Sequence, residues 1–148
     1  MAVVQIPCYC ATLRQAARAV TALYDERFKP AGLRATQFTI LQTLDFQPGA
    51  RIADMVEWLA IDQTTLTRNL ALLEAQGLVA VVDRPSGREK CWGLTKSGAS
   101  KFADARPLWE GAQADVAERF GRQRTRSMHA DVHALANALA GVKDEQGA

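Results

Sequence analysis

A segment expected to be helical over about residues 63–76 carries the side chains best suited to bind another molecule. At about 100° per residue, three leucines fall within one narrow arc and form its buried side. The opposite side is small, hydroxyl-bearing and basic, with no bulky apolar group. Such a face suits the major groove of DNA, where Arg pairs with guanine and Thr contacts bases or a thymine methyl group. Taken alone, the pattern also fits a solvated surface helix. The candidate DNA-binding residues here are Gln63, Thr64, Thr65, Thr67 and Arg68.

Cations gather again further along the chain. Between Arg84 and Lys96 four of them stand against one acid, Glu89. The turn at residues 85–87 is narrow enough to approach a groove, where an Arg can enter the minor groove while its neighbours contact phosphates. A solvated hairpin tip explains one or two such charges more readily than four. The candidate contacts in this segment are Arg84, Arg88 and Lys90.

Two of the three cysteines lie where a thiol can be reactive. Cys10 begins the first expected helix, where free amide groups favour a thiolate, and Arg14 one turn along could stabilise it. Oxidation to a sulfenic acid would then allow Cys8, Cys91 or a small thiol to form a disulfide with it. The alternative is that these thiols are small buried apolar groups. Three cysteines make no even disulfide framework, so we expect free thiols in a reducing compartment.

The patterns for metal binding and catalysis are incomplete. Cys8, Cys10 and Cys91 could offer soft-metal ligands, and His129 and His133 lie four residues apart on an expected helix. The histidine pair lacks the Glu of the zinc-peptidase motif, which favours a solvated helix face. The sequence contains no phosphate-binding glycine loop and no nucleophile elbow. We therefore predict no metal, no cofactor and no enzymatic activity.

The elements that must position these residues are mainly helical. Two short helices are separated only by residues 60–62, with Asp62 suited to cap the second and Gly77 to end it. This is the helix-turn-helix pattern. After Gly77 the helical spacing of apolar residues ends, and two short extended segments follow that are expected to form a hairpin, or wing. We expect helices over about 11–28, 36–45, 52–59, 63–76 and 97–120, a last helix around 128–139, and strands over 78–82 and 90–94.

The fold class is therefore mainly α with a small β-hairpin wing (α+β), a winged helix-turn-helix in one domain. Thr95 or Ser97 can cap the long helix that follows the wing, and Pro107 should interrupt that helix with a kink. The first helix and the last two carry more apolar surface than a winged domain of about 65 residues can cover, which favours a homodimer. We expect a DNA-binding lobe over about 33–96 and a dimerisation platform over about 8–30 and 97–141.

Composition limits the classes of partner. The formal net charge is only +2, so a nucleic-acid surface must be local. Apolar residues make up 48% of the chain, which excludes a disordered protein. No apolar run approaches the roughly 18 residues of a membrane span, and the first ten residues lack the basic start of a signal peptide. We expect no membrane partner and a cytoplasmic location.

From about Cys8 to Leu139 the chain resembles the MarR family of multiple-antibiotic-resistance regulators. The resemblance implies a triangular homodimer whose DNA-binding lobes are held by a helical platform made from both chain ends. Such proteins usually repress a nearby gene and release DNA on binding a small molecule or on thiol oxidation. The residues that carry the resemblance are Ala31-Gly32-Leu33 with Gln37, Asp62 through Arg68, Gly77-Leu78-Val79, Asp83-Arg84 through Arg88, and Leu94-Thr95 with Gly98.

A narrower resemblance concerns the thiols. In members that sense organic hydroperoxides, a reactive Cys begins the first helix, and Cys10, Ala11, Arg18, Thr21 and Tyr24 fall at matching spacings here. Two tyrosines hydrogen-bond the sulfur in those relatives; Tyr24 matches one, but Arg14 stands at the other position. The chain also departs from the family at the wing tip, where many members have an Asp and this sequence has Ser86.

We interpret the protein as a sequence-specific, double-stranded DNA-binding repressor that binds a pseudo-palindromic operator as a homodimer. A cavity near Trp109 and the first helix, with Arg14, is the expected effector site. The alternative is a helical dimeric protein-interaction module without DNA binding. The near-neutral charge of residues 62–96 favours that alternative, because four acids offset five cations there.

Overall fold

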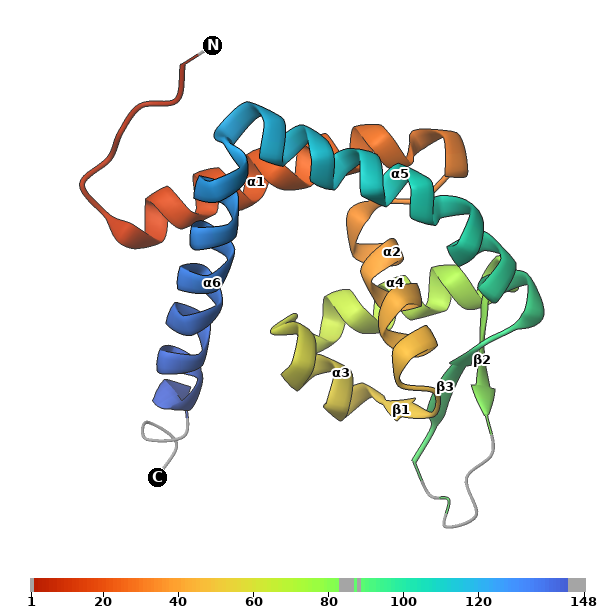
Figure 1. Cartoon of the computed structure of the whole chain (residues 1–148). Helices are drawn as coiled ribbons and strands as arrows, with labels where there is room; N and C mark the ends of the chain where they lie inside the picture. The colour runs from red at the N-terminus through yellow and green to blue at the C-terminus, as the bar shows by residue number, and fades with distance from the viewer. Residues whose placement is uncertain (1, 83–86, 88, 144–148) are drawn as a thin grey trace. The chain divides into compact units, whose positions relative to one another are not determined.

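The computed structural model describes residues 2–82, 87 and 89–143, and the side chains of those up to 141 (Figure 1). The chain divides into two compact units, Met1–Trp109 and Glu110–Ala148. In chain order the elements are α1 (Tyr9–Phe28), a 3₁₀ turn (Lys29–Ala31), α2 (Ala35–Phe46), β1 (Ala50–Arg51), α3 (Ile52–Leu59), α4 (Gln63–Ala75), β2 (Val79–Val82), β3 (Cys91–Leu94), α5 (Lys96–Phe120), α6 (Arg122–Leu139) and a second 3₁₀ turn (Ala140–Lys143).

The core of the first unit is built around α2. Phe38 on this helix stacks on Phe28 of α1 at a ring-centroid distance of 4.6 Å. On another side, Phe38 lies 5.3 Å from Phe102 and 6.3 Å from Trp109, both on α5. These pairs place an aromatic cluster at the centre of the unit, where stacking adds to the burial of apolar area. Helices α3 and α4 and the small sheet gather around the other end of α2 (Figure 1).

Two side chains cap the start of α2. The Oε1 atom of Gln37 accepts the backbone N–H of Arg34 at 3.0 Å, and Oδ1 of Asp25 accepts the backbone N–H of Ala35 at 2.7 Å. Free amides at a helix start need such acceptors. Gln37 is only 7% exposed, so its role here is structural.

The sheet has three antiparallel strands in the order β1-β3-β2. Ala50 of β1 and Val81 of β2 both lie opposite Trp92 of β3, whose ring is buried against the core. The hairpin of β2 and β3 confirms the expected wing strands. Strand β1 was not predicted, because two residues are too short to show an alternating pattern.

Pro107 does not end the long helix, and the kink expected there stays a prediction. Helix α5 continues through this residue. Pro107 cannot donate a hydrogen bond to the carbonyl of Ala103, but both residues are exposed, so water can satisfy the freed carbonyl. The expected cap of α5 is confirmed at Thr95, whose Oγ1 accepts the backbone N–H of Gly98 at 3.0 Å.

In the second unit, Gly121 separates α5 from α6 with a φ of 104°, a conformation that favours glycine. Arg124 lies over the ring of Phe120 at 4.2 Å. Helix α6 buries none of its residues in the single chain. Its apolar stripe is exposed at Met128, Val132, Leu135 and Leu139.

Within the described residues, no helix combines the length and the apolar character that crossing a bilayer requires.

Candidate nucleic-acid interface

The turn between α3 and α4 is fixed by its own residues. Ala60 ends α3 with φ 49°, the one positive φ among the described non-glycine residues, and thereby allows a tight turn. Asp62 caps α4: its Oδ1 accepts the backbone N–H of Thr65 at 2.9 Å, and its Oδ2 accepts the Thr65 hydroxyl. The predicted helix-turn-helix and its N-cap are therefore present.

Helix α4 is anchored by the three leucines that the sequence placed on its buried side. Leu66, Leu70 and Leu73 are at most 1% exposed. Burying a Leu side chain contributes about 1.5–3 kcal/mol, so the orientation of α4 about its axis is strongly fixed. The opposite side must then face solvent.

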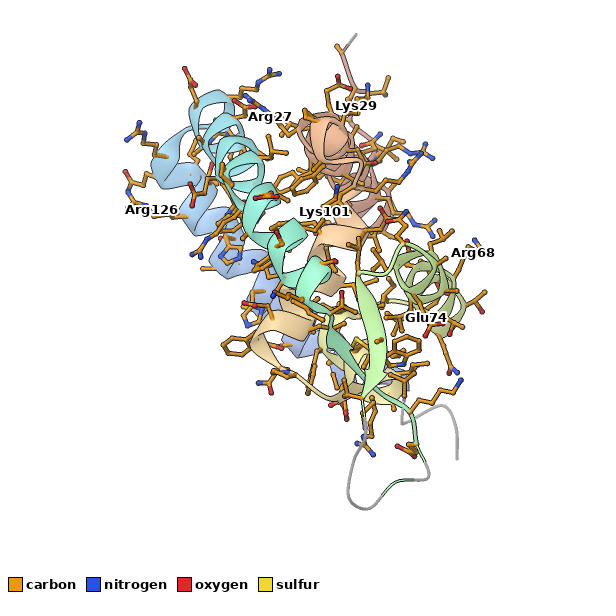
Figure 2. All side chains as sticks on the ribbon, turned by 90° about the vertical axis from the view of Figure 1, so that its right-hand side faces the viewer. Arg27, Lys29, Arg68, Glu74, Lys101 and Arg126 are labelled. Atoms are coloured by element: carbon orange, nitrogen blue, oxygen red, sulfur yellow. The ribbon has the colours of Figure 1, made fainter. Side chains whose placement is uncertain are left out.

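That outward face carries most of the predicted DNA-binding side chains. Gln63, Thr64, Thr67 and Arg68 are exposed, and Arg68 extends away from the helix in Figure 2. Thr65 differs, because it is half-buried and its hydroxyl is used by Asp62. The expectation that no bulky apolar group stands on this side is wrong near the end of α4, where Leu72 is 49% exposed.

Thr95 joins the end of α4 to the wing. Its hydroxyl donates to the carbonyl of Gly77 at 2.6 Å, and its backbone N–H donates to the carbonyl of Leu78 at 3.1 Å. Its Oγ1 also caps α5 through Gly98. One residue therefore holds the end of α4, the start of β2 and the start of α5 together, and so sets where the hairpin leaves the lobe.

Of the three DNA-binding residues predicted in the wing, the structure describes only Lys90. Lys90 is exposed and lies immediately before β3. Arg84 and Arg88 lie outside the described residues. An unpredicted ionic group lies at the base of the hairpin: Arg51, the last residue of β1, contacts both Asp54 and Glu89. In the sequence this group is visible only as an Arg directly before an expected helix, with an Asp three residues later. Such a pair looks the same as ordinary surface charge.

The three cysteine thiols differ in their exposure to solvent. Cys8 is the N-cap residue of α1 and Cys10 lies in its first turn, and both are exposed. Cys91 is buried, as expected of a small apolar residue. Tyr24 is not near Cys10 in the same chain, because 14 residues of helix span roughly 21 Å. Tyr24 packs edge-on against Phe28 at 6.2 Å, and burial raises the pKa of its hydroxyl.

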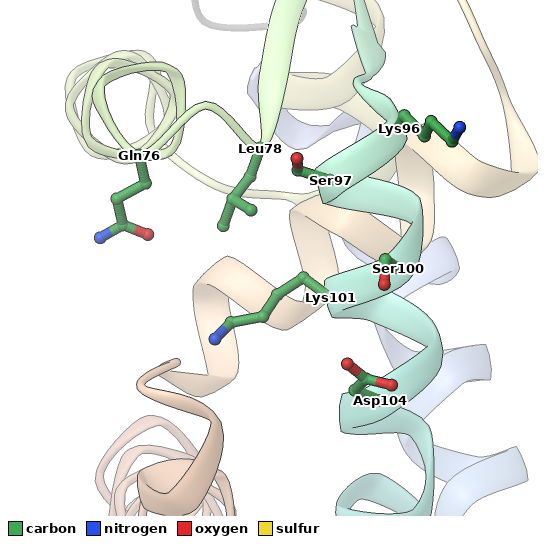
Figure 3. Close-up of a pocket in the computed structure, with 7 residues that line it drawn as sticks. All are labelled: Gln76, Leu78, Lys96, Ser97, Ser100, Lys101 and Asp104. Atoms are coloured by element: carbon green, nitrogen blue, oxygen red, sulfur yellow. The ribbon is translucent and has the colours of Figure 1, made fainter.

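The residues expected at an effector site are Trp109 and Arg14. Trp109 is half-buried beside Phe38, whereas Arg14 is exposed on α1. A hollow of about 710 Å³ lies elsewhere, at the start of α5 (Figure 3). It is lined by Gln76, Leu78, Lys96, Ser97, Ser100, Lys101 and Asp104. The effector site stays a prediction.

Among the side chains that the structure describes, no three His, Cys, Asp or Glu residues are grouped so that they could hold a metal ion.

Asp62 makes the stability of this lobe depend on pH. Hydrogen bonds from the side chain and backbone of Thr65 lower the pKa of its carboxyl group. A carboxyl with a lower pKa in the folded state stabilises the fold above its unfolded pKa of about 3.9, and the effect is lost as pH falls through the folded pKa.

We therefore expect the wild type to lose more unfolding free energy than Asp62→Asn between about pH 5 and the acid limit of folding. Asn keeps an N-cap acceptor but does not titrate. Urea unfolding of both proteins at several pH values measures this difference. Parallel pH curves for the two proteins would show that the Asp62 cap contributes no pH dependence.

A helix-turn-helix with a fixed second helix, a polar and basic outward face and a hairpin behind it defines a winged helix-turn-helix DNA-binding protein. The model of the MarR family matches residues 31–89. The crystal structure of the transcriptional regulator MosR from M. tuberculosis is 33% identical, covering 89% of this chain and 97% of that one with a TM-score of 0.76. MosR in complex with DNA is 35% identical, covering 88% and 97%, with a TM-score of 0.74.

BpsR of Bordetella bronchiseptica is 22% identical, covers 92% of this chain and 98% of its own, and has a TM-score of 0.80, so it supports the fold. None of the curated proteins matches the chain. The chain belongs to the MarR family, and it is a DNA-binding transcriptional regulator.

Proposed function

We propose that the protein is a repressor that binds a pseudo-palindromic operator as a homodimer, with α4 in the major groove and the hairpin beside it. The observation that carries this proposal is the fixed outward face of α4, where exposed hydroxyl groups and Arg68 stand opposite three buried leucines. Helices with such a face read base edges in the major groove. MosR, solved in complex with DNA, supports the same use of the lobe here.

The homodimer is proposed from the apolar surface that the chain leaves bare. The α6 stripe is 36–57% exposed, and Leu13 and Val20 of α1 are 39% and 40% exposed. Exposed apolar stripes of this kind usually bind a partner, most often a second copy related by a twofold axis. The proposed division is a DNA-binding lobe over about residues 33–96 and a dimerisation platform over about 8–30 and 97–141.

Release from DNA is proposed to follow binding of a small molecule or oxidation of a thiol. BpsR, whose DNA binding is regulated by 6-hydroxynicotinic acid, shows that a protein of this fold can respond to a small ligand. Trp109 and Arg14 remain our proposed place for such a ligand. We propose no catalytic activity for this repressor, and a location in the cytoplasm.

Selection of bound genomic fragments, followed by titration of one fragment at several salt concentrations, tests the proposed function. We expect a preferred fragment with an inverted repeat, and an affinity that falls steeply as salt rises because bound phosphates displace counterions. The absence of any preferred fragment, with no salt-dependent binding, would favour the protein-interaction module instead.

The exposed thiols at the start of α1 give a separate prediction. If Cys10 is the sensor, hydroperoxide converts its thiolate to a sulfenic acid and is itself reduced to an alcohol; the Cys8 thiol then displaces water to form a disulfide. Cys10→Ser should bind DNA normally but resist release by hydroperoxide, while Cys8→Ser should change only the recovery. Operator binding with and without cumene hydroperoxide measures both effects. Release of Cys10→Ser at the wild-type dose would exclude Cys10, and a small ligand would become the expected signal.

A further inference from the structure

Glu89 is an acid in a segment that otherwise carries cations. It stands between Arg88 and Lys90, where a negative charge would repel DNA. In the structure this side chain makes an internal contact: its Oε2 accepts a hydrogen bond from Nη1 of Arg51 at 3.1 Å. The two residues are 38 positions apart in the chain, so the contact ties the returning arm of the hairpin to the start of α3.

Arg51 is itself held in place by Asp54. Its Nε donates to Oδ2 of Asp54 at 2.9 Å, and its Nη2 donates to Oδ1 at 2.7 Å. This two-point contact fixes the plane of the guanidinium group. The backbone N–H of Arg51 also donates to Asp54, at 3.1 Å. With Nε and Nη2 of the guanidinium bonded to Asp54, Nη1 donates to Glu89.

The backbone around this contact is also tied. Arg51 lies opposite Cys91 in the β1–β3 pairing, and Val82 lies opposite Cys91 in the β2–β3 pairing. Cys91 is buried, and its Sγ donates to the carbonyl of Glu89 at 3.7 Å. Glu89 is therefore held through its carbonyl by the thiol of Cys91 and through its side chain by Arg51.

We propose that Arg51 is a positioning residue for the wing: by holding Glu89 it fixes the place at which the chain enters β3. Arg suits this role because its planar group offers two parallel donors to Asp54 and a separate donor to Glu89, whereas Lys carries all its donors on one nitrogen. One guanidinium between two carboxylates leaves a net charge of −1, so Glu89 contributes order at the base of the hairpin and not attraction for DNA. The effect on DNA binding rests on the proposed function, whereas the ordering of the hairpin does not.

For Glu89→Gln, electrostatics alone and the loss of the Arg51 contact predict different changes in DNA binding. Removing an acid beside the DNA should strengthen binding to every sequence. A loosened hairpin should instead lose its preference for a narrow, A·T-rich groove over a G·C-rich one. Because the Arg51 and Glu89 side chains are 41% and 66% exposed, we expect a loss of preference of about two- to fivefold.

The test uses Arg51→Lys, Glu89→Gln and the double variant, with Glu57→Gln as the control that removes an exposed acid from α3. Without DNA, the ¹H–¹⁵N heteronuclear NOE of the Gly87 and Glu89 amides should fall in both single variants and no further in the double. With the selected fragment, the ratio of affinities for A·T-rich and G·C-rich flanks should fall in the same three proteins. Glu57→Gln should match the wild type in both measurements.

Two results would overturn the proposal. One is an unchanged NOE in both single variants. The other is tighter binding of Glu89→Gln to both flanks with an unchanged ratio. A wild type that binds no DNA would remove the proposed function but leave the NOE measurement to decide the role of Arg51.

Discussion

Gly98→Ala should destabilise the first unit by about 3 kcal/mol, although alanine is the better helix former by about 0.5–1 kcal/mol. A Cβ atom on Gly98 would lie 1.8 Å from the carbonyl oxygen of Leu78. That oxygen also accepts the N–H of Thr95, and the N–H of Gly98 donates to Oγ1 of Thr95. Relief of the clash would therefore break the bonds that join α5 to the start of β2.

Urea unfolding followed by circular dichroism measures this loss, with Ser100→Ala as the control. Ser100 is exposed two positions along the same helix, so its replacement should change stability by less than about 0.5 kcal/mol. Equal stability of Gly98→Ala and the wild type would mean that the close approach of α5 to Leu78 does not exist in solution.

Leu135→Glu should raise the dissociation constant of the proposed homodimer by about 100-fold or more. A carboxylate in an apolar interface loses its hydration without gaining a partner, which costs several kcal/mol. Leu135 is 39% exposed in the single chain and lies in the middle of the α6 stripe. Operator affinity should fall as well, because two half-sites are bound jointly.

Ala130→Glu is the matched control, since Ala130 is exposed on the side of α6 away from the stripe. Sedimentation velocity over a range of concentrations distinguishes dimer from monomer for both variants. A Leu135→Glu protein that remains dimeric at the same concentrations as Ala130→Glu would place the interface elsewhere.

The parts of this fold that the sequence predicted are those with a repeating physical signal. Leu66, Leu70 and Leu73 recur at helical spacing, so the buried side of α4 and its outward face followed directly. Asp62 could be identified as a cap because its side chain acts within one turn of its own position. Both predictions depend only on neighbours in the chain.

The parts that could not be predicted depend on contacts between distant residues. Thr95 could be read as a helix cap, but its bond to Gly77 joins residues 18 positions apart. Arg51 and Glu89 each looked like surface charge until the sheet placed them together. That α5 continues through Pro107 could not be predicted either, because the exposure that makes the lost hydrogen bond tolerable is a property of the folded protein.

Arg68→Ala tests most directly whether the outward face of α4 reads DNA. Fluorescence anisotropy at fixed salt should compare the wild type, Arg68→Ala and Lys29→Ala on the selected fragment and on single-base variants of each half-site. Lys29 pairs with Glu26 on the exposed surface and controls for the loss of one positive charge. Arg68→Ala should weaken specific binding by about 1–3 kcal/mol and lose discrimination at one base pair per half-site, while Lys29→Ala should match the wild type. Unchanged affinity and unchanged base preference in Arg68→Ala would contradict the account.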